Sequence, residues 1–275
     1  MPYPEQLIIV RHGKSVENFI KRARAPTSVP ISRSALVECL REVFQNPHRE
    51  LWPLVEEGRR QMRIAGQWIR CSIDTRFDAY QRSPFVRTVE SSELLGLPNA
   101  HWIDECDLRE KGSEQSITSY LTDLSIERMM DKLGIPKEER IDESKIYTKQ
   151  VIEVHARARR VYQKLRDLQG VNSLIMVSHG GFMVGLRVAI EGWSRADYIR
   201  NDTQRDPLDW VHNGLVLEYS RKDPYTDELT EGYSWMRMVC PWNTSLSSNV
   251  WRPVANQEGS NCDEYQCEGK LLRSY

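Results

Sequence analysis

The chain lacks both a long apolar run and a surplus of charge of either sign. No apolar stretch approaches the roughly 18 residues that cross a membrane. Its 38 basic and 39 acidic residues give a net charge of -1, so the whole molecule does not attract nucleic acid or anionic lipid. The first residues also lack the basic start and apolar core of a secretory signal. We therefore expect a cytoplasmic protein with no nucleic acid and no membrane among its partners.

Cysteine pairs of the zinc-binding kind are also missing. The six cysteines include no pair at C-x-x-C spacing, which is a common signature of structural zinc. Thiols stay reduced in a cytosol, although Cys262 and Cys267 are close enough in sequence to bridge. The sequence therefore indicates no metal site and leaves the pairing of these two cysteines open.

Two short apolar runs, each followed by a histidine and a glycine, are the most informative feature that is present. Leu7–Val10 leads into His12, and Leu174–Val177 leads into His179. Short, apolar, glycine-bounded runs of this kind are typical of buried parallel strands. Because open α/β sheets build their sites at the carboxyl ends of such strands, the two histidines are expected to share one crevice.

Strand and helix patterns alternate along the chain. Besides the two runs, strands are expected at 77–80, 215–219 and 235–239, the last two as a hairpin. Helical patterns begin at Glu56 and cover about 84–95, 151–168 and 181–190. This alternation predicts an α/β fold of three layers, with a mostly parallel central sheet and helices on both faces.

The expected organisation is a single domain with loop insertions and a tail. Residues 1–240 form the domain, with insertions at about 19–53, 111–150 and 192–212. The first insertion is polar and contains a short helix near 34–44, and the second is a lid of helices and loops. Residues 241–275 are rich in asparagine, serine, glycine and proline, which predicts an irregular tail.

Two arginines give the histidine crevice its chemical character. Arg11 directly precedes His12, and a neighbouring cation lowers the pKa of an imidazole and leaves a neutral nitrogen. Arg87 lies in the first turns of the helix after Ser83 and Pro84, near the positive end of its dipole. The planar guanidinium matches phosphate oxygens, so the pattern favours attack of a histidine on a phosphoryl group.

Four blocks in this order resemble the histidine phosphatase superfamily, which includes cofactor-dependent phosphoglycerate mutases and many phosphomonoesterases. The similarity is scattered over about residues 5–240. It is carried by Arg11-His12-Gly13-Lys14-Ser15 with Asn18, by Ser83-Pro84-Phe85-Val86-Arg87-Thr88, by Leu108-Arg109-Glu110 and by Val177-Ser178-His179-Gly180-Gly181.

The resemblance implies a role for each of six residues. His12 is the nucleophile that becomes phosphohistidine. The oxygens of the transferred phosphoryl group are held by Arg11, Arg87 and His179, with Asn18 as a further ligand. Glu110 is the proton donor, which requires a raised pKa and partial desolvation. No metal and no cofactor is implied. Without the motif, Glu110 would be one more acid of the charged run 104–114.

Departures from the family pattern favour a phosphatase. The residues after Glu110 lack the tyrosine and basic pair that we associate with mutases, and Gly180-Gly181 is more typical of phosphatases. The resulting hypothesis is a metal-independent phosphomonoesterase acting on a small phosphorylated substrate. The alternatives are a phosphoglycerate mutase-type phosphotransferase and a non-catalytic module that binds a phosphorylated ligand.

The substrate and the oligomeric state stay open, including whether the chain forms a homodimer. Lys14 stands where glutamate or glutamine is common, and either adds positive charge at the mouth or points to solvent. The three insertions are expected to line the entrance. Their basic residues either bind a second anionic group of the substrate or are simply solvated: Lys21, Arg22 and Arg24. Their tryptophans either stack on the substrate or pack within the protein: Trp193 and Trp210.

Overall fold

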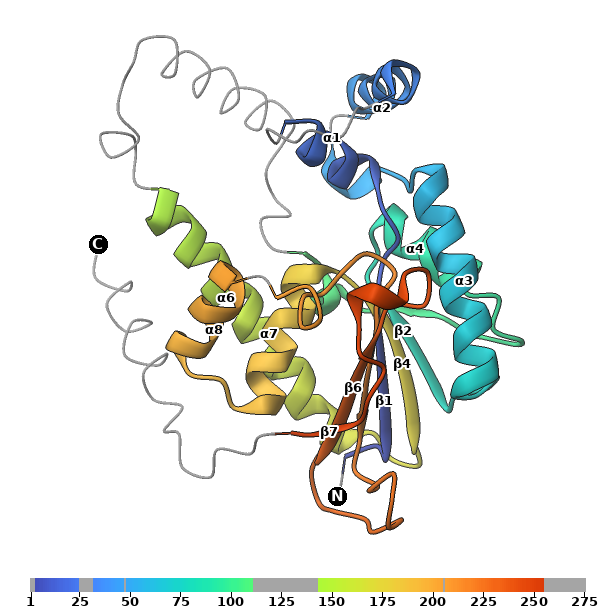
Figure 1. The fold of residues 1–275 in the computed structure, drawn as a ribbon, viewed down its shortest axis with the longest axis vertical. Coiled ribbons are helices and arrows are strands. Elements are labelled where there is room, and N and C mark those ends of the chain that lie inside the picture. The colour runs from blue at the N-terminus through green and yellow to red at the C-terminus, as the bar shows by residue number, and fades with distance from the viewer. Residues whose placement is uncertain (1–2, 25–31, 47, 111–142, 205, 255–275) are drawn as a thin grey trace.

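A computed structural model describes residues 3–24, 32–46, 48–110, 143–204 and 206–254. Within these ranges the chain forms one seven-stranded sheet with the strand order β3-β2-β4-β1-β5-β6-β7 (Figure 1). The strands in chain order are β1 (Gln6–Arg11), β2 (Ala79–Arg82), β3 (Ile103–Asp104), β4 (Ser173–Ser178), β5 (Val216–Ser220), β6 (Trp235–Val239) and β7 (Arg252–Pro253).

The pairing of β1 with β4 places the two histidine blocks side by side. β3, β2, β4 and β1 are parallel to one another, and β5, β6 and β7 continue the sheet in antiparallel fashion. Arg11 lies opposite Ser178 in the register, so β1 and β4 end at the same level. The next residues along the two strands, His12 and His179, are therefore neighbours at the carboxyl edge.

Helices cover both faces of this sheet, as expected. Figure 1 shows α3 and α4 on one face and α6 and α7 on the other, with α1 and α2 beyond the carboxyl edge. The helices are α1 (Val16–Arg24), α2 (Arg33–Gln45), α3 (Glu56–Ser72), α4 (Val86–Leu94), α6 (Glu143–Lys164), α7 (Gly180–Glu191) and α8 (Arg195–Gln204). Short 3-10 turns are η1 (Arg49–Leu51), η2 (Cys106–Leu108), η4 (Leu165–Asp167) and η5 (Thr244–Leu246).

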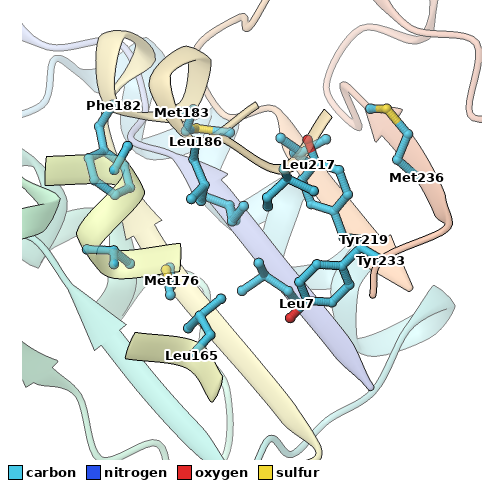
Figure 2. Close-up of a cluster of buried hydrophobic side chains, with 14 of the residues drawn as sticks. Leu7, Leu165, Met176, Phe182, Met183, Leu186, Leu217, Tyr219, Tyr233 and Met236 are labelled. Carbon is cyan, nitrogen blue, oxygen red and sulfur yellow. The ribbon is translucent and has the colours of Figure 1, made fainter. Parts of the chain in front are cut away.

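Alternation along β1 divides the core between the two faces. Leu7 and Ile9 join the cluster under α6 and α7, whereas Ile8 and Val10 join the cluster under α3. Figure 2 shows the first cluster, where Leu7 of β1 and Met176 of β4 lie below side chains of α7 such as Leu186. Because side chains of a strand point alternately to opposite faces, a continuous apolar run is what a strand between two helical layers requires.

The three-layer α/β prediction is confirmed, and the late hairpin is confirmed as β5 and β6. The helix expected near 34–44 is α2, and its apolar face packs with α1 and the fully buried Trp52. Most of the expected lid, residues 111–142, lies outside the described residues. The division into a domain and a tail stays a prediction.

Several elements differ from expectation, among them the two-residue strands β3 and β7, which were not predicted. The strand expected at 77–80 is β2, two residues later, because the Phe77 N–H donates to the Tyr80 hydroxyl and pairing with β4 begins only at Ala79. α1 and α8 were not predicted. α8 has no buried residue, so no hydrophobic periodicity marked it. α1 is nine residues long and buries only a short apolar stripe.

Two expected absences are reported for the described residues only. No helix there is long and apolar enough to cross a membrane. The four cysteines within them, Cys39, Cys71, Cys106 and Cys240, are free thiols. Cys262 and Cys267 lie outside that part of the chain.

Candidate active site

His12 and His179 face each other at the carboxyl edge of the sheet. Their ring centroids lie 5.1 Å apart, and the planes make an angle of 65°. Both side chains are buried, with exposed fractions of 2% and 0%. The structure therefore brings together two histidines that are 167 residues apart in sequence, as their numbers show.

Glycine allows the loop after His12 to pack tightly. A Cβ atom on Gly13 would lie 2.3 Å from the carbonyl oxygen of Gly58, at the start of α3. The Gly13 N–H donates to the Ser91 hydroxyl on α4 at 3.2 Å. Close approach of the backbones leaves no room for a side chain, so this glycine sets the position of His12.

His12 carries the features of a nucleophile. Its Nδ1 lies 2.7 Å from the Gly13 carbonyl oxygen, which can only accept a hydrogen bond. Nδ1 therefore holds the proton and Nε2 carries the lone pair. Burial, and then the charges of Arg87 and Arg11, lower the pKa of His12 well below its ordinary value of 6.5. At neutral pH the ring is uncharged and Nε2 can attack phosphorus.

His179 is held from the opposite side of the crevice. Its Nε2 makes a 2.8 Å hydrogen bond with the Ser83 hydroxyl, and its ring packs edge-on against Phe85 at 5.0 Å between centroids. Burial lowers its pKa well below the ordinary value, and Arg87, His12 and Arg11 lower it further. The second ring nitrogen, Nδ1, is buried without a hydrogen-bond partner among the described residues.

Arg11 and Arg87 come from β1 and α4, and the charges of both act on His12 and His179. Arg11 donates from Nη1 to the Val211 carbonyl at 2.6 Å, and Arg87 donates from Nη1 to the Arg49 carbonyl at 3.0 Å. The Arg87 guanidinium also stacks 4.8 Å from the centroid of Phe85. In each arginine Nε is buried with no hydrogen-bond partner in the described chain. Buried donors of this kind are costly unless a ligand completes them.

A buried acid beside Arg87 was not predicted from the sequence. The carboxylate of Glu17 is 5% exposed and pairs with Lys21 at 2.7 Å, with Arg87 at 3.4 Å and closely with Arg49. Burial opposes ionisation, but Lys21, Arg87 and Arg49 together lower the pKa of Glu17 well below 4.5. It thus stays charged and orients two arginines. The only sequence signal was its spacing of four residues from Lys21.

Asn18 braces the loop that carries His12. Its Oδ1 accepts from the Ser15 N–H at 3.1 Å, from the Ser15 hydroxyl at 3.0 Å and from Nδ2 of Asn213 at 3.1 Å. Nδ2 of Asn213 also lies 3.1 Å from the His12 carbonyl oxygen. The amide oxygen of Asn18 is therefore occupied by protein donors.

Glu110 lies beside the N-terminus of α7. It is half-buried, and its Oε2 accepts from the Gly181 N–H at 3.4 Å. Burial lowers the pKa values of Arg11 and Arg87, and the negative charge of Glu110 acts against this effect on both. A carboxyl at this position lies next to the arginines that would hold a phosphoryl group.

Neighbouring acids of the charged run have other partners. Glu105 accepts from the Asp107 N–H at 3.0 Å, and Asp107 pairs with Arg160 and Lys164 of α6, each at 3.1 Å. Glu114 lies outside the described residues. Glu110 is thus the acid of this run that the structure brings to the crevice among the described ones.

Two of the basic residues that were expected to lie near the entrance, Lys14 and Lys21, are paired with acids. Nζ of Lys14 lies 2.6 Å from a carboxylate oxygen of Glu57, so its charge is balanced rather than presented to substrate. Lys21 pairs with Glu17, and Arg22 is exposed, while the side chain of Arg24 lies outside what the structure describes. Trp193 and Trp210 both have protein partners. Cζ of Arg187 lies 4.4 Å from the centroid of the Trp193 ring.

Acidification should destabilise the protein through the two buried histidines. An unfolded chain takes up their protons near pH 6.5, whereas the folded chain keeps both rings neutral, so the unfolded state binds more protons below that pH. We expect the free energy of unfolding to be fully retained above about pH 6.5 and to fall as the pH drops toward about 5. Urea titrations at a series of pH values measure this, with His12→Gln reducing the slope. An unchanged slope in that variant would contradict the prediction.

Solved structures of other proteins resemble this fold at low sequence identity. No curated protein matches the chain. Among solved structures, mycobacterial hydrolase 1 is 16% identical with a TM-score of 0.50, covering 78% of this chain and 91% of that one. YhfR of Bacillus stearothermophilus is 16% identical with a TM-score of 0.50, and the match covers 82% of this chain and 94% of that one. A phosphoserine phosphatase from Entamoeba histolytica is 14% identical with a TM-score of 0.47, and the match covers 78% of this chain and 90% of that one. At such identities the first two show a shared fold.

The family itself follows from the sequence model of the histidine phosphatase superfamily (branch 1), which matches residues 7–217. That range contains both histidine blocks, both arginines and Glu110. The chain belongs to the histidine phosphatase superfamily.

Proposed function

We propose that the protein is a metal-independent phosphomonoesterase that hydrolyses a small phosphorylated substrate through a phosphohistidine on His12. One observation carries the proposal. Nε of Arg11, Nε of Arg87 and Nδ1 of His179 are buried without hydrogen-bond partners among the described residues, and the charges of both arginines act on a neutral His12. A phosphoryl group supplies the acceptor oxygens that these nitrogens lack.

In the first step the His12 Nε2 lone pair forms a bond to phosphorus while the bond from phosphorus to the ester oxygen breaks. The carboxylic acid of Glu110 gives its proton to the departing oxygen, so an alcohol leaves and a carboxylate remains. Arg11 and Arg87 compensate the charge spread over the phosphoryl oxygens, which is the main requirement of a loose transition state.

In the second step water attacks the phosphohistidine. The Glu110 carboxylate takes a proton from that water as its oxygen bonds to phosphorus, and the phosphorus–nitrogen bond breaks. Inorganic phosphate leaves, and both His12 and Glu110 return to their starting protonation states. In this proposal residues 1–240 form the catalytic domain, and Asn18 supports the site by holding the His12 loop.

Phosphate release from p-nitrophenyl phosphate tests the proposal, followed by a screen of sugar phosphates, nucleotides and phosphopeptides. Rapid quenching with labelled substrate should trap an acid-labile, base-stable phosphoenzyme. Binding without turnover would instead indicate the non-catalytic module. Activity that appears only with bisphosphoglycerate and returns the phosphoryl group to a glycerate would indicate the mutase.

Chelators should leave the activity unchanged. The arginines and the N-terminus of α7 already compensate phosphoryl charge, a role that magnesium fills in other phosphoryl-transfer enzymes. Within the described residues no three of histidine, cysteine, aspartate and glutamate lie together as a metal site. We expect equal kcat/KM before and after dialysis against EDTA. A loss that zinc or magnesium restores would contradict this part of the proposal.

A further inference from the structure

The turn that carries Glu110 is held by two buried side chains from distant parts of the chain. Nη1 of Arg157 donates to the carbonyl oxygens of Asp107 at 2.9 Å and of Arg109 at 2.6 Å, and its Nη2 donates to that of Glu110 at 3.2 Å. The Ser178 hydroxyl donates to the carbonyl oxygen of Leu108 at 2.7 Å. Four consecutive carbonyl groups are thereby occupied.

This arrangement is more specific than a surface ion pair. Arg157 lies on α6 with its side chain 6% exposed, and its pKa is lowered, first by burial. Its guanidinium binds three backbone carbonyls of the turn, and its Nε lies 3.5 Å from a carboxylate oxygen of Glu153 on the same helix. Ser178 directly precedes His179, so the same turn is also tied to the second histidine block.

Glu110 lies at the carboxyl end of the short turn η2, where the turn's own backbone hydrogen bonds are few. The last backbone bonds within it run from Leu108 N–H to Glu105 and from Arg109 N–H to Cys106. Glu110 directly follows this 3-10 turn; its Oε2 accepts from the Gly181 N–H at 3.4 Å, and its carbonyl oxygen accepts from Nη2 of Arg157 at 3.2 Å. A general acid misplaced by about 1 Å can lose on the order of 10²-fold in rate.

We propose that Arg157 is a positioning residue that sets the location of Glu110, the proton donor, by holding the backbone of residues 107–110. This inference rests on the proposed function, in which Glu110 protonates the leaving oxygen. In this proposal Arg157 acts through the backbone of the turn; its charge also acts on Glu110 and His179, which is why the test includes a variant that keeps the charge.

The test compares two substrates that differ in their need for a proton. β-Glycerophosphate has a poor leaving group and depends on the acid, whereas p-nitrophenyl phosphate releases p-nitrophenolate, which is a stable anion. The quantity measured is the ratio of kcat/KM for the first to kcat/KM for the second. Partial unfolding lowers both values equally, so this ratio is independent of how much protein is active.

Three variants separate position from charge and from general destabilisation. Arg157→Met removes the contacts with all three carbonyls. Arg157→Lys keeps the charge but replaces the planar fork, which spans two nitrogen positions, by one compact ammonium. Arg160→Met is the matched control, because Arg160 lies on the same helix and contacts the same turn only through the exposed Asp107 side-chain pair.

We expect Arg157→Met to lower the ratio roughly tenfold to hundredfold, Arg157→Lys to lower it less, and Arg160→Met to leave it unchanged. In a Glu110→Gln background, Arg157→Met should lower the ratio no further, because the group that it positions is already gone. Equal losses on both substrates in Arg157→Met, or a wild-type ratio in Arg157→Lys, would overturn the inference.

Failure of the inference and failure of the proposed function give different results. If Glu110→Gln lowers the ratio and Arg157→Met does not, Glu110 is the acid and Arg157 does not position it. If Glu110→Gln itself leaves the ratio unchanged, the assignment of the acid is wrong and the inference falls with it.

Discussion

Replacement of His12 by alanine is expected to abolish both turnover and phosphoenzyme formation. Nε2 of this residue is the nucleophile that attacks the substrate in the proposed mechanism, and neither arginine can take its place. Removing a nucleophile that works as part of a unit costs on the order of 10⁶-fold in kcat. Steady-state phosphate release and trapping with labelled substrate measure the two effects separately.

The fold should survive this substitution. His12 is buried beside two arginines that oppose its protonation, and Gly13, rather than the imidazole, makes the tight contact with α3. Circular dichroism and thermal unfolding check this point. His101→Ala is a matched control, because His101 is exposed and should leave activity unchanged. Label found on a serine or a cysteine of the wild-type enzyme would show that the mechanism is wrong.

Replacement of Glu110 by glutamine should slow an alkyl phosphate by roughly 10²–10⁴-fold. Glutamine keeps the size of the side chain and its contact with the Gly181 N–H but cannot give a proton to the leaving oxygen. An aryl phosphate with a leaving group of low pKa needs less protonation, so its phosphorylation step should suffer less. Values of kcat/KM for β-glycerophosphate and p-nitrophenyl phosphate measure the difference.

The same substitution should also change which step limits turnover of the aryl substrate. Because Glu110 is proposed to activate water as well, dephosphorylation becomes slow. Stopped-flow should then show a burst of released nitrophenol followed by slow turnover. Equal, small losses on both substrates and no burst would make Glu110 a bystander. Glu105, Asp107 or Glu114 would then be the next candidates.

Much of the fold was predictable because its signals are local. The apolar runs of β1 and β4 are each bounded by glycine and continuous across both faces, which is what burial between two helical layers demands. The same pattern placed a histidine after each strand. α8, in contrast, buries nothing, so its sequence carries no periodic signal.

The composition of the crevice was predictable only in part. The order of the motifs indicated five candidate site residues: His12, His179, Arg11, Arg87 and Glu110. The structure places these five near one another. Their catalytic roles stay predictions. Glu17 was missed because its partners, Arg87 and Arg49, are 70 and 32 residues away, and an acid in a charged helix reads as a surface residue.

By itself, the sequence determined that β1 and β4 are buried, that a histidine follows each of these two strands, and that Arg11 stands beside His12. Only the tertiary structure decided the register that sets Arg11 opposite Ser178, the pairing of Lys14 with Glu57, and the hold of Arg157 on the turn of Glu110. The physical reason is distance along the chain. Periodicity reports burial within one element, whereas hydrogen bonds between elements depend on how their packed faces align, which no single segment encodes.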